Sequence, residues 1–172
     1  LFRMRAMRAY GLKLRDRMAL VSTHGHGHPA WSALQRLGVY RQTRIFLLDP
    51  PAEIAARILA ARPEVVTGNA AVLARAASEI TGRRGAYRPR FVVSGAEMLT
   101  PFMRREIEEG FGAPLYDTYG SEEMSLIAWE CPDSGLYHVS DDSVLVEVLD
   151  KDGHPVRRGE RGEVVATALH FY

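Results

Sequence analysis

The segment "RFVVSGAEMLTPFMRREIEEGFGAPLYDTYG", residues 90–120, decides the fold of this chain. It begins with the apolar run FVV, which is typical of a buried strand. Thr100 and Pro101 then provide an N-cap and a first helical residue for a helix over 102–112, which ends in glycine. The apolar run within 114–120 predicts the next strand. This order predicts two parallel strands with a helix packed against them.

The same alternation continues on the amino-terminal side of this segment. Short apolar runs predict strands, and the amphipathic stretches between them predict helices. The expected strands cover 18–23, 44–49 and 64–69, and the expected helices lie at 31–37, around 54–59 and at 70–80. About five strand–helix units result, which predicts a doubly wound, mainly parallel α/β sheet.

The pattern changes after residue 123. Residues 137–150 alternate and then become apolar, a turn-rich connector follows, and residues 163–169 form another strand pattern. Antiparallel hairpins fit this order better than helical crossovers. We therefore predict an α/β layer over residues 1–123 and a β subdomain over 124–172, the latter being part of a small antiparallel β-barrel.

Composition and charge narrow the class of protein. The 172 residues are 47% hydrophobic, enough for one ordinary core, and the net charge of +1 gives no field that would draw the chain to nucleic acid or to an anionic membrane. Cys131 is the single cysteine, which fits a reducing compartment, and no apolar run approaches the roughly 20 residues of a membrane span. We expect a soluble cytoplasmic protein, and the sequence does not indicate its oligomeric state. Because the sequence stops within a strand pattern, we also expect a piece of a longer protein.

Three polar segments follow predicted parallel strands, at residues 67–69, 94–97 and 117–123. Ligands of open α/β sheets bind beyond the carboxyl ends of the strands, so these segments could line one crevice. The glycines in them would let the main chain approach a flat or phosphorylated ligand, Tyr119 could stack on a base, and Glu123 could hold Mg²⁺. For each segment taken singly, a strand followed by a turn is the plain alternative.

Three blocks of this sequence resemble a known family. They are "FVVSGAEMLTPFMRREIEEGFGAPLYDTYGSEE" (91–123), "WECPDSGLYHVSDDSVLVEVLD" (129–150) and "GERGEVVATAL" (159–169). In order and spacing they resemble the phenylacetate-CoA ligase and CapK-like branch of the adenylate-forming (AMP-binding, acyl-CoA synthetase) enzymes. The resemblance covers residues 60–172. It implies a central fragment of the family's N-terminal domain, in which α/β layers are combined with a distorted β-barrel.

This resemblance implies an activity. Family members activate a carboxylic acid with Mg-ATP to an acyl-adenylate and pyrophosphate, and then pass the acyl group to a thiol, usually that of coenzyme A. For this chain it implies an AMP-forming acid–thiol ligase that uses ATP/AMP, Mg²⁺ and coenzyme A on an aryl, phenylacetate-like acid. The implied partners are this small carboxylate and coenzyme A, with no nucleic acid and no membrane. Two alternatives stay open. The first is an adenylating relative that uses another acceptor, such as a carrier thiol or the acceptor of coenzyme F390 synthetase-like members. The second is a non-catalytic nucleotide-binding domain.

The family's site residues carry over position by position. Glu123 matches the final glutamate of the motif and is implied as catalytic residue and Mg²⁺ ligand. Ten further residues are implied to bind the nucleotide: Ser94, Gly95, Ala96, Glu97, Asp117, Thr118, Tyr119, Gly120, Ser121 and Glu122. A later motif of the barrel, mainly structural, is matched by Gly159, Gly162 and Glu163.

Glu122 departs from the family, which usually has serine or threonine at this position. A carboxylate about 4 Å from the α-phosphate would be repelled by about 1 kcal/mol in water and by about 4 kcal/mol at an effective dielectric constant of about 20. Glu122 is therefore expected to point away, to pair with an arginine or to share the metal, with Ser121 supplying the hydroxyl. The family's phosphate loop, ribose-binding aspartate and catalytic lysine have no match here, since neither Lys13 nor Lys151 has a matching context. We expect the chain alone to be inactive.

Two groups of residues have the chemistry of zinc ligands. His24, His26 and His28 alternate in "HGHGHP" and would share one face of a strand, but the glycines and the proline between them predict a loop without preorganised geometry. Cys131 and His138 form a second candidate pair, which needs further ligands to complete a tetrahedral site. A cysteine that packs as a small apolar residue is the plain alternative.

Overall fold

The computed structural model describes residues 2–23, 35, 37–83, 85 and 87–169. In these ranges no helix has the length and apolar character needed to cross a membrane. The helices are α1 (Phe2–Ala9), α3 (Pro51–Ala61), α4 (Ala70–Ile80) and α5 (Pro101–Phe111). The strands are β1 (Arg17–Ser22), β2 (Arg41–Phe46), β3 (Val65–Asn69), β4 (Phe91–Gly95), β5 (Leu115–Ser121), β6 (Ser125–Glu130), β7 (Tyr137–Val139), β8 (Val144–Leu149) and β9 (Glu163–Ala168).

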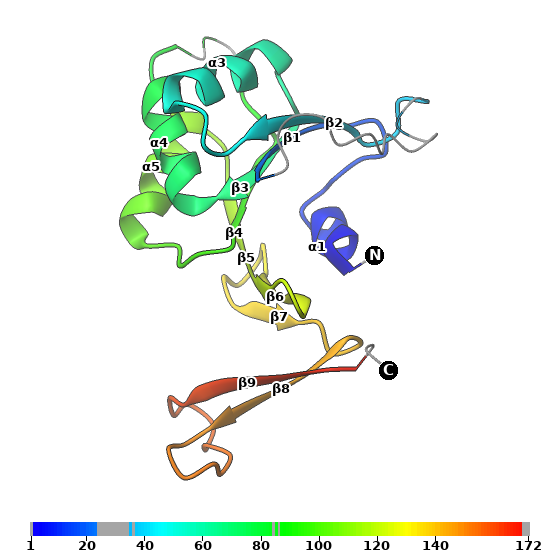
Figure 1. Cartoon of the computed structure of the whole chain (residues 1–172), viewed down its shortest axis with the longest axis vertical. Helices are drawn as coiled ribbons and strands as arrows, with labels where there is room; N and C mark the ends of the chain where they lie inside the picture. Colours follow the sequence, from blue (N-terminus) through cyan, green and yellow to red (C-terminus); the bar gives the residue numbers. More distant parts are fainter. Residues whose placement is uncertain (1, 24–34, 36, 84, 86, 170–172) are drawn as a thin grey trace.

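The first seven strands form one mixed sheet in the order β2-β1-β3-β4-β5-β6-β7. Strands β1 to β5 are parallel, whereas β6 and β7 continue the sheet in antiparallel pairing. The sheet has helices on both faces, with α3, α4 and α5 together on one side and α1 on the other (Figure 1). The predicted doubly wound, mainly parallel α/β sheet is therefore confirmed.

The helix boundaries follow the local sequence signals. The Thr100 hydroxyl accepts a hydrogen bond from the main-chain N–H of Met103 at 3.2 Å, and Pro101 occupies the first turn of α5. Gly112 ends this helix in the left-handed conformation, with φ of 64°. The α4 helix covers the predicted residues 70–80.

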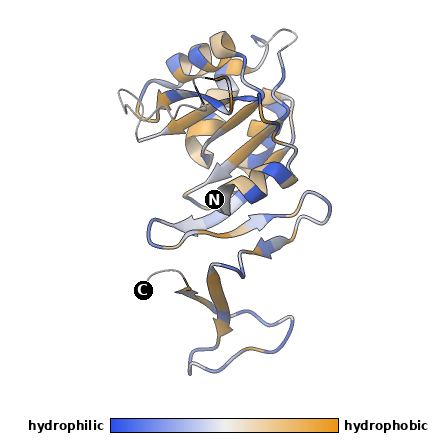
Figure 2. Ribbon diagram, turned by 90° about the vertical axis from the view of Figure 1, so that its right-hand side faces the viewer, coloured by the Kyte–Doolittle hydropathy of each residue, from blue (hydrophilic) through white to orange (hydrophobic). Residues whose placement is uncertain are grey.

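Two apolar clusters pack on opposite faces of the sheet, because successive strand residues point to opposite sides. Val92 of β4 joins the cluster beneath α3, α4 and α5, while its neighbours Phe91 and Val93 join the cluster beneath α1. Figure 2 shows the apolar colouring on the central strands and mixed colouring on the helices that cover them. Residues 91–94 of β4 are therefore all buried, on one face of the sheet or the other.

The β-rich part of the chain differs in detail from the expectation. The antiparallel pattern starts after residue 123 as predicted, but β6 and β7 extend the main sheet, and only β8 and β9 form a separate two-stranded sheet. The division into domains at 123/124 stays a prediction. Strand β2 starts at Arg41 rather than at residue 44. Most of the helix expected at 31–37 lies outside the described residues.

Candidate functional site

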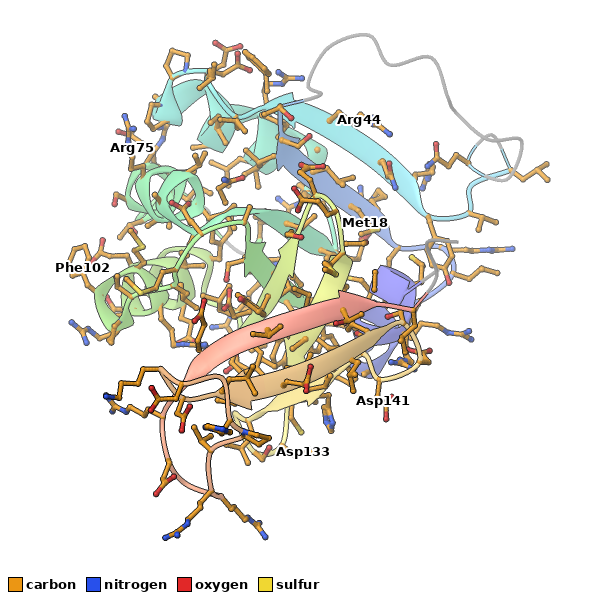
Figure 3. All side chains as sticks on the ribbon, turned by 60° about the horizontal axis from the view of Figure 1, so that its bottom comes forward. Met18, Arg44, Arg75, Phe102, Asp133 and Asp141 are labelled. Atoms are coloured by element: carbon orange, nitrogen blue, oxygen red, sulfur yellow. The ribbon has the colours of Figure 1, made fainter. Side chains whose placement is uncertain are left out.

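A pocket of about 650 Å³ lies at the carboxyl ends of β4 and β5. One wall is the loop 96–99 after β4, and another is the end of β5. Apolar side chains of the antiparallel strands close the remainder, among them Ile127, Val139, Val146 and Val164. In the view of Figure 3, β8 and β9 pass in front of the main sheet. Each of these two strands contributes a valine to the pocket, Val146 and Val164. The position agrees with the rule that open α/β sheets bind ligands beyond the carboxyl ends of their strands.

The structure brings most of the predicted nucleotide-binding residues to this pocket. Its lining includes the following six of them: Ala96, Glu97, Asp117, Thr118, Tyr119 and Gly120. Ser94 is buried and Gly95 follows it at the end of β4, next to the wall. Ser121, Glu122 and Glu123 continue from β5 onto an exposed turn and do not line the pocket. The segment 67–69 lies one strand away, with Asn69 paired to Gly95.

Asp117 is the centre of a buried polar network. Its carboxylate accepts a hydrogen bond from the Ser94 hydroxyl on one oxygen and from the Tyr137 hydroxyl on the other, both at 2.6 Å. Its main-chain N–H donates to Glu130 at 2.8 Å. Glu130 in turn accepts two hydrogen bonds from Arg104, at 2.8 and 3.0 Å. Each carboxylate is thus paired or hydrogen-bonded, as buried charges require.

Three members of this network, Tyr137, Glu130 and Arg104, were not predicted from the sequence. The only local signal was a glutamate at the end of the apolar run of β6. Burial is the largest cause that raises the pKa of Tyr137, and its hydrogen bond to Asp117 raises it further. The hydroxyl therefore keeps its proton at neutral pH and remains a donor to Asp117.

Gly95 and Gly120 are required by packing between strands. A Cβ at Gly95 would lie 2.5 Å from Thr118 Oγ1, and one at Gly120 would lie 2.0 Å from the carbonyl oxygen of Ser125. Their missing side chains thus leave room for the protein's own strands. Close approach of a ligand to the main chain of Gly120 stays a prediction.

The loop after β4 combines a special conformation with a helix cap. Ala96 has φ of 66°, a left-handed conformation that is unusual for a residue with a side chain and is common at functional sites. Glu97 accepts a hydrogen bond at 2.7 Å from the N–H of Ala71, in the first turn of α4. A carboxylate at a helix N-terminus is favourable, so Glu97 has a structural role beside its place in the pocket wall.

Ser121, Glu122 and Glu123 belong to the tight turn that joins β5 to β6. The Ser121 hydroxyl accepts from the N–H of Met124 at 3.1 Å, and Ser125 closes the turn with φ of 61°. The pKa of Glu123 is lowered, first by a hydrogen bond from its own main chain and then by one from the Ser121 side chain. Glu123 is therefore ionised at neutral pH. Glu122 is exposed and, like Glu123, lies outside the pocket wall, and its expected arrangement stays a prediction.

Cys131, which directly follows β6, is brought to His138 in the middle of β7. The pKa of the Cys131 thiol is lowered to about 7, mainly by a hydrogen bond from the Ser134 side chain, then by main-chain groups, with His138 contributing least. The His138 ring also lies 4.4 Å from that of Trp129. The described residues contain no group of three or more histidine, cysteine, aspartate or glutamate side chains that could hold a metal. Zinc at this pair stays a prediction, and the histidines at 24, 26 and 28 lie outside the described residues.

Comparison with known proteins gives a CoA ligase by sequence and CoA ligases by structure. No protein-family model matches the chain. Over 83 residues, 46% of the chain, it is 34% identical to "Phenylacetate-coenzyme A ligase" of Thermus thermophilus, and it spans 19% of that protein's length. A structure of a 2-hydroxyisobutyryl-CoA ligase matches 95% of this chain and 38% of its own, with a TM-score of 0.77 and 19% identity. A benzoate CoA ligase from Burkholderia xenovorans matches 94% of this chain and 35% of its own, with a TM-score of 0.68 and 19% identity.

The two structures show the fold of this chain, which it shares with both CoA ligases. The sequence match confirms the predicted resemblance to a phenylacetate-CoA ligase. The chain spans about a fifth of the length of the curated relative that it matches.

Proposed function

We propose that this chain, which has the fold of the adenylate-forming enzymes and a sequence similar to a phenylacetate-CoA ligase, holds the nucleotide in an AMP-forming acid–thiol ligase. One observation carries the proposal. Parts of the two segments that resemble the family motifs, residues 96–97 and 117–120, line one pocket on the carboxyl edge of the sheet. The structure of the 2-hydroxyisobutyryl-CoA ligase contains an acyl-AMP and CoA, which supports ATP and coenzyme A as substrates here.

The proposed acid is an aryl carboxylate of the phenylacetate type. A curated relative is named for phenylacetate, and one structural relative is named for benzoate. The carboxylate is proposed to react in the cytoplasm as a free small molecule, with coenzyme A as the acceptor.

The pocket offers suitable contacts for an adenine nucleotide. Tyr119 is 48% exposed and lines the pocket, so its ring is free to stack on a base. The main chain at 117–120 and the loop at 96–97 form the adjoining walls. Apolar residues such as Ile127 and Val139 would shield a reactive acyl-adenylate from water.

In the proposed reaction, a carboxylate oxygen of the acid attacks the α-phosphorus of ATP. The new bond joins that oxygen to phosphorus, the bond to the β-phosphate oxygen breaks, and pyrophosphate leaves. The thiol of coenzyme A then attacks the acyl carbon, and AMP leaves. The pocket's part is to orient two anions against their repulsion.

Glu123 is the residue of this chain that would hold Mg²⁺. Its carboxylate is ionised and exposed, on the turn three residues after Gly120 of the pocket wall. Mg²⁺ is usually bound by one or two carboxylates together with substrate phosphates. When bound, the ion would neutralise phosphate charge. Glu122 has no such role in this proposal.

Carboxylate-dependent exchange of pyrophosphate into ATP tests the proposal on the complete protein, with aryl and fatty acids as substrates. We expect exchange with an aryl acid, a strong loss for Glu123→Gln, and an unchanged or raised rate for the matched variant Glu122→Ser. Equal losses from both variants would refute the separate roles and indicate a shared metal site.

A second candidate is a nucleotide-binding domain without the chemistry. It is favoured by the exposed turn, because neither Glu122 nor Glu123 lines the pocket. Folded protein that binds ATP but shows no exchange with any acid would establish this second function.

A further inference from the structure

Tyr137 links the pocket wall to the buried network at Asp117. Its ring lines the pocket, and its hydroxyl donates to Asp117 at 2.6 Å. It lies on the short strand β7, directly opposite Glu130 of β6 in the strand pairing. Glu130 accepts the main-chain N–H of Asp117, so the two cross-strand partners hold Asp117 by its side chain and by its main chain.

We propose that Tyr137 is a positioning residue for the nucleotide: it fixes Asp117, and through it the β5 main chain, in the form that receives the base. This inference rests on the proposed function. It adds a residue that lies outside both family-matched segments of the pocket, at 94–97 and 117–123.

The geometry explains why one hydroxyl has this effect. Each Asp117 carboxylate oxygen has one side-chain donor, Ser94 on one and Tyr137 on the other. Loss of the Tyr137 hydroxyl leaves one oxygen of a buried carboxylate without its partner, which is costly. The carboxylate can recover a partner by turning toward water in the pocket, and that movement displaces the main chain of the adjoining Thr118 and Tyr119.

Two other hydrogen bonds that do not involve Tyr137 also hold β5 in the sheet. Thr118 Oγ1 donates to the Ser94 carbonyl at 2.7 Å, and Arg104 donates to the Leu115 carbonyl at 3.0 Å. These contacts remain when Tyr137 is changed. The expected effect of the change is therefore local, on the pocket wall, while the sheet stays folded.

Nucleotide binding by Tyr137→Phe tests the inference. The complete protein is titrated calorimetrically with ATP, AMP and pyrophosphate. We expect the Kd for ATP and AMP to rise about tenfold, as for loss of a hydrogen bond to a charged group, while the Kd for pyrophosphate stays unchanged. In the exchange assay, KM for ATP should rise while KM for the acid stays the same.

Tyr87→Phe is the matched control. Tyr87 is equally an aromatic donor, and its hydroxyl binds the carbonyl of Pro63 at 3.0 Å near the amino-terminal edge of the sheet. Loss of this hydrogen bond in Tyr87→Phe should lower the free energy of unfolding about as much as in Tyr137→Phe, but the Kd for ATP and AMP should not change. If Tyr137→Phe does not fold, Ser94→Ala removes the other donor to Asp117, and the same tenfold loss is expected.

The possible outcomes separate the two proposals. Wild-type protein that binds no ATP would overturn the proposed function, and this inference with it. If the wild-type protein binds ATP and the Kd of Tyr137→Phe for ATP lies within twofold of the wild-type Kd, the inference alone would be overturned. An equal rise of KM for ATP and for the acid would also overturn it, because a general structural defect has that signature.

Discussion

Replacement of Gly120 by alanine should destabilise the fold through the β5–β6 hairpin. The new Cβ would lie 2.0 Å from the Ser125 carbonyl oxygen, and main-chain atoms cannot rotate away as a side chain can. Real Cβ atoms essentially never approach closer than 3.0 Å, so the strands must separate by at least 1.0 Å, the difference between the two distances. This separation disturbs the pairs Gly120–Leu126 and Ser121–Ser125 next to the turn.

The cost can be estimated from its parts. Overpacking costs about 1–3 kcal/mol, and the weakening of two main-chain hydrogen bonds adds about 1 kcal/mol each. The free energy of unfolding should therefore fall by about 3–5 kcal/mol. For a chain of this size, that corresponds to a fall in Tm of roughly 6–20 °C.

Urea unfolding of the chain measures this cost, because Trp129 on β6 is buried beside the hairpin and reports its opening by fluorescence. Gly135→Ala is the control, since Gly135 has φ of 68° with no atom within 4 Å of a new Cβ. There we expect only the conformational cost of about 1–2 kcal/mol. A loss at Gly120 no greater than at Gly135 would refute the reasoning that the glycine is required by strand packing.

Two further predictions concern the surroundings of the candidate site. Arg104→Met removes the partner of Glu130, whose side chain is only 12% exposed, and should lower the free energy of unfolding by about 3 kcal/mol. Adding Glu130→Gln to this variant should restore part of that free energy. A loss below about 1 kcal/mol in Arg104→Met would contradict the role of the pair. Cys131 has a lowered pKa, so its thiolate forms at lower pH than that of an ordinary cysteine. Its alkylation by iodoacetamide, followed by mass spectrometry, should rise to half its maximal rate near pH 7. Ser134→Ala should move that midpoint toward about 8.5, the ordinary cysteine value, and should shift it more than His138→Ala does. A midpoint above about 8 in the unchanged chain would show that the turn does not stabilise the thiolate.

The sequence by itself determined the parallel layer and the place of the candidate site in it. Helix α5 has an N-cap, a first-turn proline and a terminal glycine within its own residues, and each acts through neighbours in the chain. The strand runs 90–98 and 114–120 likewise needed only local apolar patterns. Once both strands were placed in one parallel sheet, the segments that follow them had to meet at its carboxyl edge.

Only the tertiary structure decided how that edge is held together. Asp117 is 20 residues from Tyr137, and Arg104 is 26 residues from Glu130, so no local pattern records either contact. The need for a residue without a side chain at Gly120 also depends on strands that meet in space. The same holds for the pairing of β6 and β7 with the main sheet. Local signals come from interactions within a few residues, whereas hydrogen bonds between strands are set by which strands become neighbours. For this reason the sequence located the pocket, and the fold supplied the network that positions its wall.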